Sequence, residues 1–404
     1  MHIPKINIKL LVMVLMSWSI LGVPGVLAIL WFQWMAGWRF AVDSAKKHGI
    51  HDAESSRLGG LAVFAAVGMF LIWGGIDESS RYLADVDRVG SFPFGFLAVA
   101  LCGALGLAED VRRDFLTPRA RLGLKFLVFV VILFQWPEIQ PTSLGFEPLD
   151  SMLQTPVLGL MLAAVFLVGF LNAFNMADGA NGLMPGVMTC AMLIFYLQSG
   201  RMVDEALFTA FAAFLLFNIV VGNFFLGDMG TYGIGCMLAL FGFRFFNDGT
   251  LSLAFLAALF AYPCLDFLMS IFRRMANGRS PFSPDNDHLH NRLYFQLAKR
   301  LGNGVVANSM SGLLISMSTS GLVLLGYLQT WWPADSNDWV VVFGAVIALY
   351  IVAFYLCGRG RHSSRWSSQL GCIVCVIVRR QSEPNTLEGL SDAEGRTRCL
   401  RGKA

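Results

Sequence analysis

The sequence predicts an all-α, polytopic membrane protein. Of its 404 residues, 56% are apolar and only 14% are charged, whereas soluble globular chains carry about 25% charged residues. A membrane-spanning helix needs about 20 mainly apolar residues, and by that measure the chain holds about eleven spans, with its unusual polar residues in the loops between them. We therefore expect one integral membrane domain over residues 1–357.

The predicted spans follow one another along this whole domain. They cover residues 10–35, 59–76, 92–108, 122–137, 156–172, 183–198, 206–222, 229–246, 251–272, 307–329 and 338–357. Several are short, so we expect some to be bent or half-buried. The first is too long for a signal-peptide core and lacks a cleavage pattern, which indicates a retained membrane helix. Residues 358–404 are expected to form a cytoplasmic, mostly disordered tail.

Basic residues indicate how the chain is oriented, because short cytoplasmic loops are rich in Lys and Arg. Loops 36–58, 109–121 and 273–306 are basic, whereas the loops that alternate with them hold only Arg81, Arg88 and Arg201. The N-terminus is therefore predicted to lie outside and the C-terminus inside. The net charge of +3 is small and its basic residues lie in short blocks, so no nucleic acid partner is indicated.

Carboxylates stand at the ends of apolar runs in three of the predicted cytoplasmic loops. Glu109 and Asp110 are adjacent, and they repel each other unless a cation or a proton is shared between them. Asp228 is bracketed by glycines and could either hold a divalent cation or cap a helix N-terminus. Because Mg²⁺ binds one or two carboxylates together with substrate phosphates, we expect Asp110, Asp178 and Asp228 to form a shared Mg²⁺ site, with Mn²⁺ as an alternative.

The loop around Asp178 carries an unusual set of amides. Asn172, Asn175 and Asp178 recur every three residues, which in a helix places them along one stripe. Gly179 and Gly182 would then allow a ligand to approach the backbone closely. The alternative is a polar stripe that pairs membrane helices.

Two further loops combine basic side chains with features suited to phosphate. His288, His290 and Arg292 lie together in the longest cytoplasmic loop. Phosphate contact, surface histidines and a zinc ligand pair are the alternatives there, although no cysteine lies nearby and the spacing differs from that of hydrolytic zinc helices. Arg57 precedes the pair Gly59–Gly60 at the start of a predicted helix, and this arrangement also suits phosphate binding.

Taken in order, these loops resemble the polyprenyl-phosphate N-acetylhexosamine-1-phosphate transferase family over residues 45–295. The matching positions are His51, Arg57, Gly59 and Gly60; Glu109 and Asp110; Asn172, Asn175, Asp178 and Asn181; Phe225, Gly227, Asp228 and Gly230; and His288 and His290. The chain departs from the family pattern at Glu109, Asn181 and Asn291, where the family has Asp, Asp and His.

The resemblance implies an eleven-span enzyme of the bacterial inner membrane with its active site on the cytoplasmic side. It would transfer N-acetylhexosamine 1-phosphate from a UDP-sugar to undecaprenyl or another polyprenyl phosphate and release UMP, as the first step of a cell-surface polysaccharide such as O-antigen. The resemblance also implies that Asn181 contacts the nucleotide base, that Phe225 stacks on uracil, and that Asn218 contacts the substrate. A homodimer is left open.

The mechanism that we expect assigns each polar group a role. Asp228 would bind Mg²⁺ directly, and Asp178 would be a second ligand or a ribose and diphosphate contact. Glu109 or Asp110 would deprotonate or orient the lipid phosphate, while His288 and His290 neutralise the diphosphate. Covalent catalysis through an acyl-phosphate is an alternative within this hypothesis.

Two functions of other classes compete with it. The first is a secondary transporter, whose acids would lie near the membrane midplane. The second is a relative of the family that has lost activity through its changes at Glu109, Asn181 and Asn291.

Overall fold

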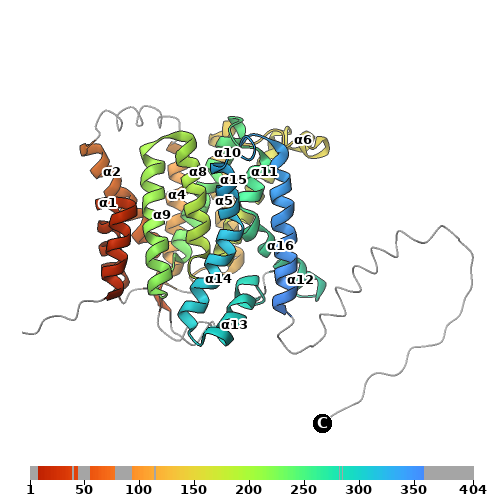
Figure 1. The fold of residues 1–404 in the computed structure, drawn as a ribbon. Coiled ribbons are helices and arrows are strands. Elements are labelled where there is room, and N and C mark those ends of the chain that lie inside the picture. Colours follow the sequence, from red (N-terminus) through yellow and green to blue (C-terminus); the bar gives the residue numbers. More distant parts are fainter. Residues whose placement is uncertain are drawn as a thin grey trace, which may run out of the picture. The chain divides into compact units, whose positions relative to one another are not determined.

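The computed structural model describes residues 8–38, 41–43, 55–77, 93–112, 115–281, 283 and 285–358. Within these residues the regular structure is α-helical, apart from two short 3-10 helices, labelled η, and one antiparallel pair of two-residue strands (Figure 1). The predicted all-α class is therefore confirmed. His51 and the predicted tail beyond Gly358 lie outside the described residues.

The elements follow in this order: α1 (Ile8–Ala36), β1 (Val42–Asp43), β2 (Ser55–Ser56), α2 (Gly59–Asp77), α4 (Pro93–Val111), α5 (Pro118–Gln135), η1 (Pro137–Ile139), α6 (Glu147–Leu153), α7 (Pro156–Ala177), α8 (Leu183–Ser199), α9 (Met202–Val221), α10 (Gly227–Asn247), α11 (Leu253–Leu259), α12 (Ala261–Ala276), α13 (Leu289–Leu301), α14 (Gly304–Ser318), α15 (Ser320–Leu328), η2 (Asn337–Trp339) and α16 (Val340–Gly358).

Every predicted span falls on one of these helices or on two consecutive ones. In the described part of the chain, six helices are long and apolar enough to cross a membrane, and two bent pairs raise that number to at most eight. The count of eleven is thus not confirmed. Helices α2 and α8 are shorter apolar helices, and α5 carries Arg119, Arg121 and Lys125 in its first half.

The two bent pairs match the expectation that some spans would not be straight. Helices α11 and α12 meet at 75°, and α14 and α15 meet at 44°. At the first bend, Pro263 lies in the opening turn of α12, where its missing N–H has no helical partner to lose. Because of the bend, the polar side chains of α12 do not lie along the axis of α11.

Helix α10 lies at the centre of the bundle, and most of its residues are buried. It packs against α4, α7 and α2. Glycines allow the closest of these contacts: a Cβ atom on Gly106 of α4 would lie 2.2 Å from the carbonyl oxygen of Asp228 on α10. Small residues at helix interfaces allow backbones to approach in this way. The end of α4 therefore lies directly against the start of α10.

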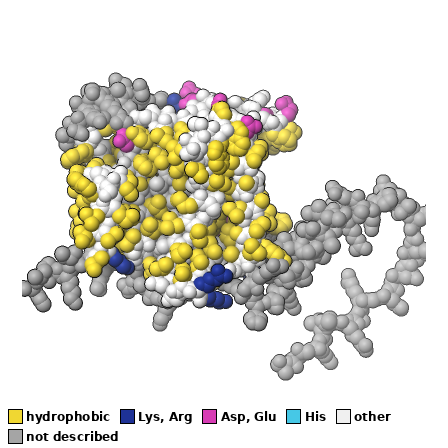
Figure 2. Space-filling model, in the orientation of Figure 1, with side chains coloured by type: hydrophobic (Ala, Val, Ile, Leu, Met, Phe, Trp, Pro, Cys, Tyr) yellow, Lys and Arg dark blue, Asp and Glu magenta, His cyan; other side chains and the backbone are white. Residues whose placement is uncertain are grey.

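The surface has the layout of a protein that crosses a membrane several times. Figure 2 shows a broad belt of hydrophobic side chains, with Lys and Arg gathered at the edge where α13 lies and mostly Asp and Glu at the opposite edge. Exposed apolar residues occur on many helices, among them Trp18, Phe134, Val157 and Val341. Such an extended apolar surface is stable in lipid and would be costly in water.

The contact between α4 and α10 gives a first prediction. Gly106→Ala should lower the thermal stability of the detergent-purified protein, because the added methyl group would overlap the Asp228 carbonyl. Gly123→Ala in α5 is the matched control, since a Cβ atom there meets nothing within 4 Å. That control should be neutral or slightly stabilising, as is usual for Gly to Ala in a helix. Equal midpoints for the two variants would contradict the proposed close packing.

Candidate active site

The Asp110 carboxylate joins the end of α4 to the start of α10. Its Oδ1 accepts a hydrogen bond from the backbone N–H of Asp228 at 2.9 Å, and its Oδ2 accepts one from Met229 at 2.8 Å. The first N–H groups of a helix lack helical partners, and a negative charge there is favoured by the helix dipole. The Arg57 guanidinium lies 3.9 Å from the same carboxylate. Asp110 therefore fixes the position of its neighbour, Asp228.

Glycines allow the first loop to pack on this helix start. The N–H groups of Gly59 and Gly60 donate to the carbonyls of Phe225 and Leu226 at 2.9 and 2.8 Å. A Cβ atom on Gly60 would lie 2.2 Å from the backbone nitrogen of Gly230. The space beside the glycine pair is therefore filled by backbone, so this pair shapes a loop contact and does not line the phosphate pocket that the sequence suggested.

Glu109 lies in a different environment from its neighbour. Its Oε1 accepts a hydrogen bond from the Leu116 N–H at 2.9 Å. Its Oε2 lies 3.4 Å from Nη1 of Arg121, and that same guanidinium nitrogen lies 3.9 Å from Oδ2 of Asp228. Arg121 thus links two of the predicted acids.

Arg121 and Lys125 are site residues that the sequence analysis missed. Helix α5 begins at Pro118 after the N-cap Thr117, which places Arg121 and Lys125 one turn apart on one face. Lys125 is 1% exposed; its Nζ donates to Asn172 at 2.7 Å and lies 4.0 Å from the centre of the Tyr232 ring. A lysine inside a predicted span is rare enough to have been a signal on its own.

The predicted stripe of amides is present, and it faces α5 and α10. Asn172 accepts the Lys125 hydrogen bond. Asn175 Nδ2 donates to Asp228 Oδ1 at 2.6 Å and to the Thr231 hydroxyl at 3.0 Å. These contacts are the helix-pairing bonds of the alternative interpretation, but one of them also holds a predicted metal ligand.

Asp178 follows the last residue of α7 and completes an acidic pair with Asp228. Burial, together with the nearby Asp228 charge, raises the pKa of the Asp178 carboxyl to about 7. Among the described residues, no group of three or more His, Cys, Asp or Glu side chains could hold a metal ion. Mg²⁺ needs only one or two carboxylates when phosphates and water complete its shell. Asp178 and Asp228 therefore fit such an ion, which would also relieve their repulsion.

Three side chains with predicted substrate roles lie within the protein. Asn218 is 2% exposed; its Oδ1 accepts from Gly182 at 2.6 Å and its Nδ2 donates to Phe224 at 2.7 Å. Asn181 is fully buried and Phe225 is 8% exposed. In this conformation, Asn218 ties the loop that follows α7 to the loop that precedes α10.

The two histidines are stacked, with ring centres 5.3 Å apart and planes 4° from parallel. His288 Nδ1 lies 2.6 Å from Asp266 Oδ2, and His290 Nδ1 lies 3.1 Å from the Tyr262 hydroxyl. A Cβ atom on Gly179 would lie 2.5 Å from His290 Nε2. His290 therefore touches the loop that carries Asp178.

The histidines differ in their electrostatic environment. Burial lowers the pKa of His290 to about 4, so this ring is neutral near pH 7. Burial also acts to lower the pKa of His288, but the hydrogen bond and charge of Asp266 outweigh it and raise that pKa above its ordinary value. The Tyr350 hydroxyl of α16 donates to the other oxygen of Asp266 at 2.8 Å. Asp266 is thus held from two sides.

Arg292 is engaged away from the histidines. Its guanidinium donates to both oxygens of Asp287 at 2.8 and 2.6 Å and to the Phe354 carbonyl at 3.0 Å. It also lies 3.7 Å from the centre of the Phe354 ring. In this structure the Arg292 side chain, for which a phosphate contact was predicted, therefore links α13 to α16.

The raised pKa of His288 gives a prediction of pH dependence. A raised pKa in the folded state contributes stability that is complete below the ordinary histidine pKa of about 6.5 and is lost as pH rises through the raised value. Asp266→Asn should therefore destabilise the protein most near pH 6 and progressively less at higher pH. Asp285, which also raises this pKa, and Arg273, which opposes the rise, remain in both proteins.

The control for this prediction is Tyr350→Phe, which removes one hydrogen bond to Asp266 but keeps the Asp266 carboxylate beside His288. Its destabilisation should not vary with pH over the same range. Thermal midpoints measured from pH 5.5 to 8.5 decide the matter. A destabilisation by Asp266→Asn that is constant, or that grows with pH, would contradict the proposed ion pair.

The sequence of this chain is similar to one family model and to several named enzymes. A family model described as glycosyl transferase family 4 matches residues 92–246. The probable undecaprenyl-phosphate N-acetylglucosaminyl 1-phosphate transferase of Bacillus subtilis is 25% identical over 320 residues, which are 76% of this chain and 84% of that protein. The range matched by the family model, residues 92–246, includes Glu109, Asp110, Asp178 and Asp228.

Two further relatives have similar coverage. The decaprenyl-phosphate N-acetylglucosaminephosphotransferase of Mycolicibacterium smegmatis is 26% identical over 372 residues, or 82% of this chain and 87% of that protein. The undecaprenyl-phosphate alpha-N-acetylglucosaminyl 1-phosphate transferase of Escherichia coli is 25% identical over 346 residues, or 79% and 85%. The similarity thus extends well beyond the range of the family model.

Proposed function

We propose that this chain, a member of glycosyl transferase family 4, transfers N-acetylhexosamine 1-phosphate from a UDP-sugar to undecaprenyl or another polyprenyl phosphate. The products would be a polyprenyl-diphospho-sugar and UMP, and the reaction would initiate a cell-surface polysaccharide. The relatives are named for this transfer of N-acetylglucosamine 1-phosphate. The observation that carries the proposal is the acidic pair Asp178 and Asp228, gathered from separate loops beside Arg57, Arg121 and Lys125.

The reaction joins two anions, so the site has to reduce their repulsion. An oxygen of the lipid phosphate attacks the phosphorus that carries the sugar, and the bond from that phosphorus to the bridging oxygen breaks as UMP leaves. Arg57, Arg121 and Lys125 supply positive charge around the acids. The neutral His290 ring, which touches the Asp178 loop, can donate a hydrogen bond to the diphosphate.

We assign Mg²⁺ to Asp228 and Asp178, with Mn²⁺ as an alternative. When bound, such an ion neutralises diphosphate oxygens and stabilises the leaving nucleotide. Asn175 orients Asp228 through a 2.6 Å hydrogen bond, and Asp110 fixes its backbone. Both the side chain and the backbone of Asp228 are thus held by neighbouring residues.

The structure also favours one of the two adjacent acids as the residue that meets the lipid phosphate. Both oxygens of Asp110 accept backbone hydrogen bonds from α10. Glu109 has one oxygen on a backbone N–H and the other facing Arg121. We therefore assign Glu109 to orienting or deprotonating the lipid phosphate, and Asp110 to positioning.

The site is proposed to face the cytoplasm, at the inner membrane of a bacterium. Basic side chains gather at the edge of the hydrophobic belt where α13 lies (Figure 2), and short basic loops stay on the cytoplasmic side. The acids stand at helix ends, Asp110 on α4, Asp178 after α7 and Asp228 on α10. A transporter would hold them near the membrane midplane, so transfer is the better-supported function.

The proposal is tested by incubating purified protein with labelled UDP-N-acetylglucosamine, polyprenyl phosphate and Mg²⁺, and by measuring UMP release. The same assay with other UDP-hexosamines identifies the donor. Asp228→Asn should lower turnover roughly a hundredfold or more, because it removes a charge that acts at the reacting phosphates. It should leave membrane insertion and the thermal midpoint close to those of the wild type.

Asp248→Asn is the matched control, since Asp248 lies at the other end of α10 in an exposed ion pair with Arg244. Its turnover should equal that of the wild type. Retained Mg²⁺-dependent activity in Asp228→Asn would refute the metal assignment. The absence of UMP release from the wild type with every polyprenyl phosphate and UDP-sugar tried would refute the function.

A further inference from the structure

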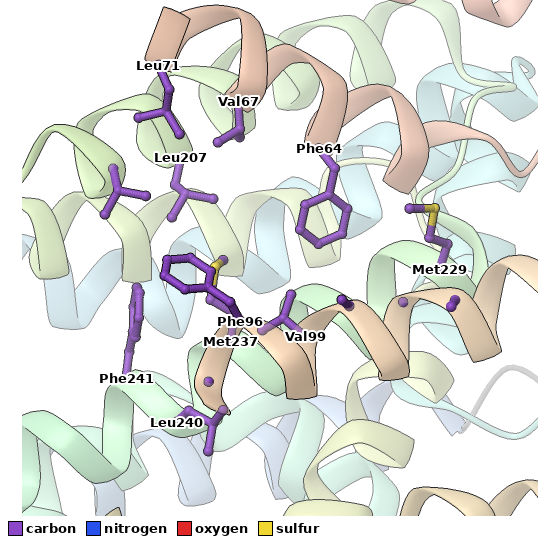
Figure 3. Close-up of a pocket in the computed structure, with 15 residues that line it drawn as sticks. Phe64, Val67, Leu71, Phe96, Val99, Leu207, Met229, Met237, Leu240 and Phe241 are labelled. Atoms are coloured by element: carbon purple, nitrogen blue, oxygen red, sulfur yellow. The ribbon is translucent and has the colours of Figure 1, made fainter. Parts of the chain in front are cut away.

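The two stacked histidines at the start of α13 differ in what their ring nitrogens contact. The apolar cavity between α2, α4, α9 and α10 is lined only by apolar residues and glycine (Figure 3), so it offers no side chain that could bind a phosphate. The histidine pair, in contrast, lies against the loop that carries Asp178. The partner of each ring nitrogen determines whether that nitrogen is available to a substrate.

Both ring nitrogens of His288 are already engaged. Nδ1 lies 2.6 Å from Asp266 Oδ2, and Nε2 lies 3.1 Å from the backbone carbonyl oxygen of Asp285. Both partners are acceptors, so both nitrogens donate and the ring is in its cationic form, in agreement with its raised pKa. His288 therefore has no ring N–H left for a substrate, and it links α12 to the loop before α13.

His290 has a ring nitrogen to which the described part of the chain offers no hydrogen-bond partner. That atom is Nε2, whereas Nδ1 lies 3.1 Å from the Tyr262 hydroxyl oxygen. The residue is only 3% exposed, and a Cβ atom on Gly179 would lie 2.5 Å from Nε2. Nε2 therefore lies directly against the loop of Asp178. A polar atom that is so little exposed gains from a ligand that supplies the missing bond.

The Tyr262 hydroxyl determines which nitrogen of His290 carries the hydrogen. Tyr262 is 1% exposed, and within the described residues its hydroxyl has hydrogen-bond partners only on His290. The backbone N–H of His290 interacts with the hydroxyl oxygen, so the hydroxyl hydrogen is directed to Nδ1. The cationic His288 ring, 5.3 Å away, disfavours a second positive charge. A neutral imidazole that accepts at Nδ1 carries its own hydrogen on Nε2.

We propose that His290, and not His288, contacts the diphosphate of the UDP-sugar through Nε2–H, and that Tyr262 is the positioning residue that keeps this hydrogen there. This inference rests on the proposed function and deepens it, because it divides the roles of the two histidines. A donor held in place in this way helps to carry the charge that develops on UMP as it leaves. The ion pair of His288 with Asp266 supports the first turn of α13 beneath it.

Removing the Tyr262 hydroxyl tests the proposal in the UMP-release assay. Tyr262→Phe should lower kcat/KM for the UDP-sugar roughly tenfold, less than the loss of a whole donor, and leave the KM for polyprenyl phosphate within twofold. Because Tyr262 acts through His290, the same substitution made in His290→Ala should change kcat/KM less than twofold. Tyr350→Phe is the matched control, since it removes another buried hydroxyl that bonds Asp266 instead. Its kinetic constants should match those of the wild type.

Nitrogen-15 NMR of the wild type tests the assignment without turnover. The sequence has six histidines, so protein labelled in its imidazole nitrogens gives few signals, and His288→Gln and His290→Gln identify the two that matter. Near pH 7, His290 should carry hydrogen on Nε2 alone, whereas His288 should carry hydrogen on both nitrogens. Saturation with UDP and Mg²⁺ should shift the Nε2 signal of His290 more than either signal of His288.

Several results would overturn the proposal. They are a hydrogen on Nδ1 of His290 in place of Nε2, a UDP-induced shift confined to His288, and the absence of a shift at both histidines. Equal effects of Tyr262→Phe in the wild type and in His290→Ala would show that Tyr262 does not act through His290. If both NMR results are as expected but the wild type releases no UMP with any substrate pair, the proposed function fails while the assignment of His290 stands.

Discussion

The hydrogen bonds from Asp110 to the start of α10 are the interaction on which the rest of the site depends. A buried carboxylate is costly unless it is paired, and here it accepts two backbone N–H groups that a helix start leaves without partners. The same pair of bonds sets α4 against α10 and places Asp228 beside Asp178. Gly106 permits the close approach that these bonds require.

Around this contact, polar side chains hold the other loops in place. Asn218 ties together the loops after α7 and before α10, Asp266 holds His288, and Arg292 fastens α13 to α16. Such groups are satisfied by one another inside the protein, as buried polar groups must be. Many of these polar side chains therefore hold the loops in fixed positions. The substrate contacts that we propose fall to a smaller set, which is Asp178, Asp228, Glu109, His290 and the nearby cations.

The fold class and the acidic cluster could be predicted from the sequence because both follow from the cost of polar groups near lipid. Apolar runs located the helices, and acids at their ends marked the site. The hydrogen-bond partners of individual side chains could not be predicted, since they depend on which helices pack against each other. The sequence could not indicate that Asn218 bonds to backbone or that Arg292 pairs with Asp287. Lys125 was missed because it belongs to none of the motifs, although its place in an apolar run was a usable signal.

Amide hydrogen exchange can show whether Asp110 caps the start of α10. The first N–H groups of a helix normally exchange quickly because they lack helical partners. If Asp110 accepts them, the amides of Asp228 and Met229 should be protected in the wild type. In Asp110→Ala they should exchange roughly tenfold faster or more, as expected for the loss of charge-assisted hydrogen bonds, while the middle of α10 is unchanged. Fast exchange at both amides in the wild type, with no further change in the variant, would show that Asp110 does not cap α10.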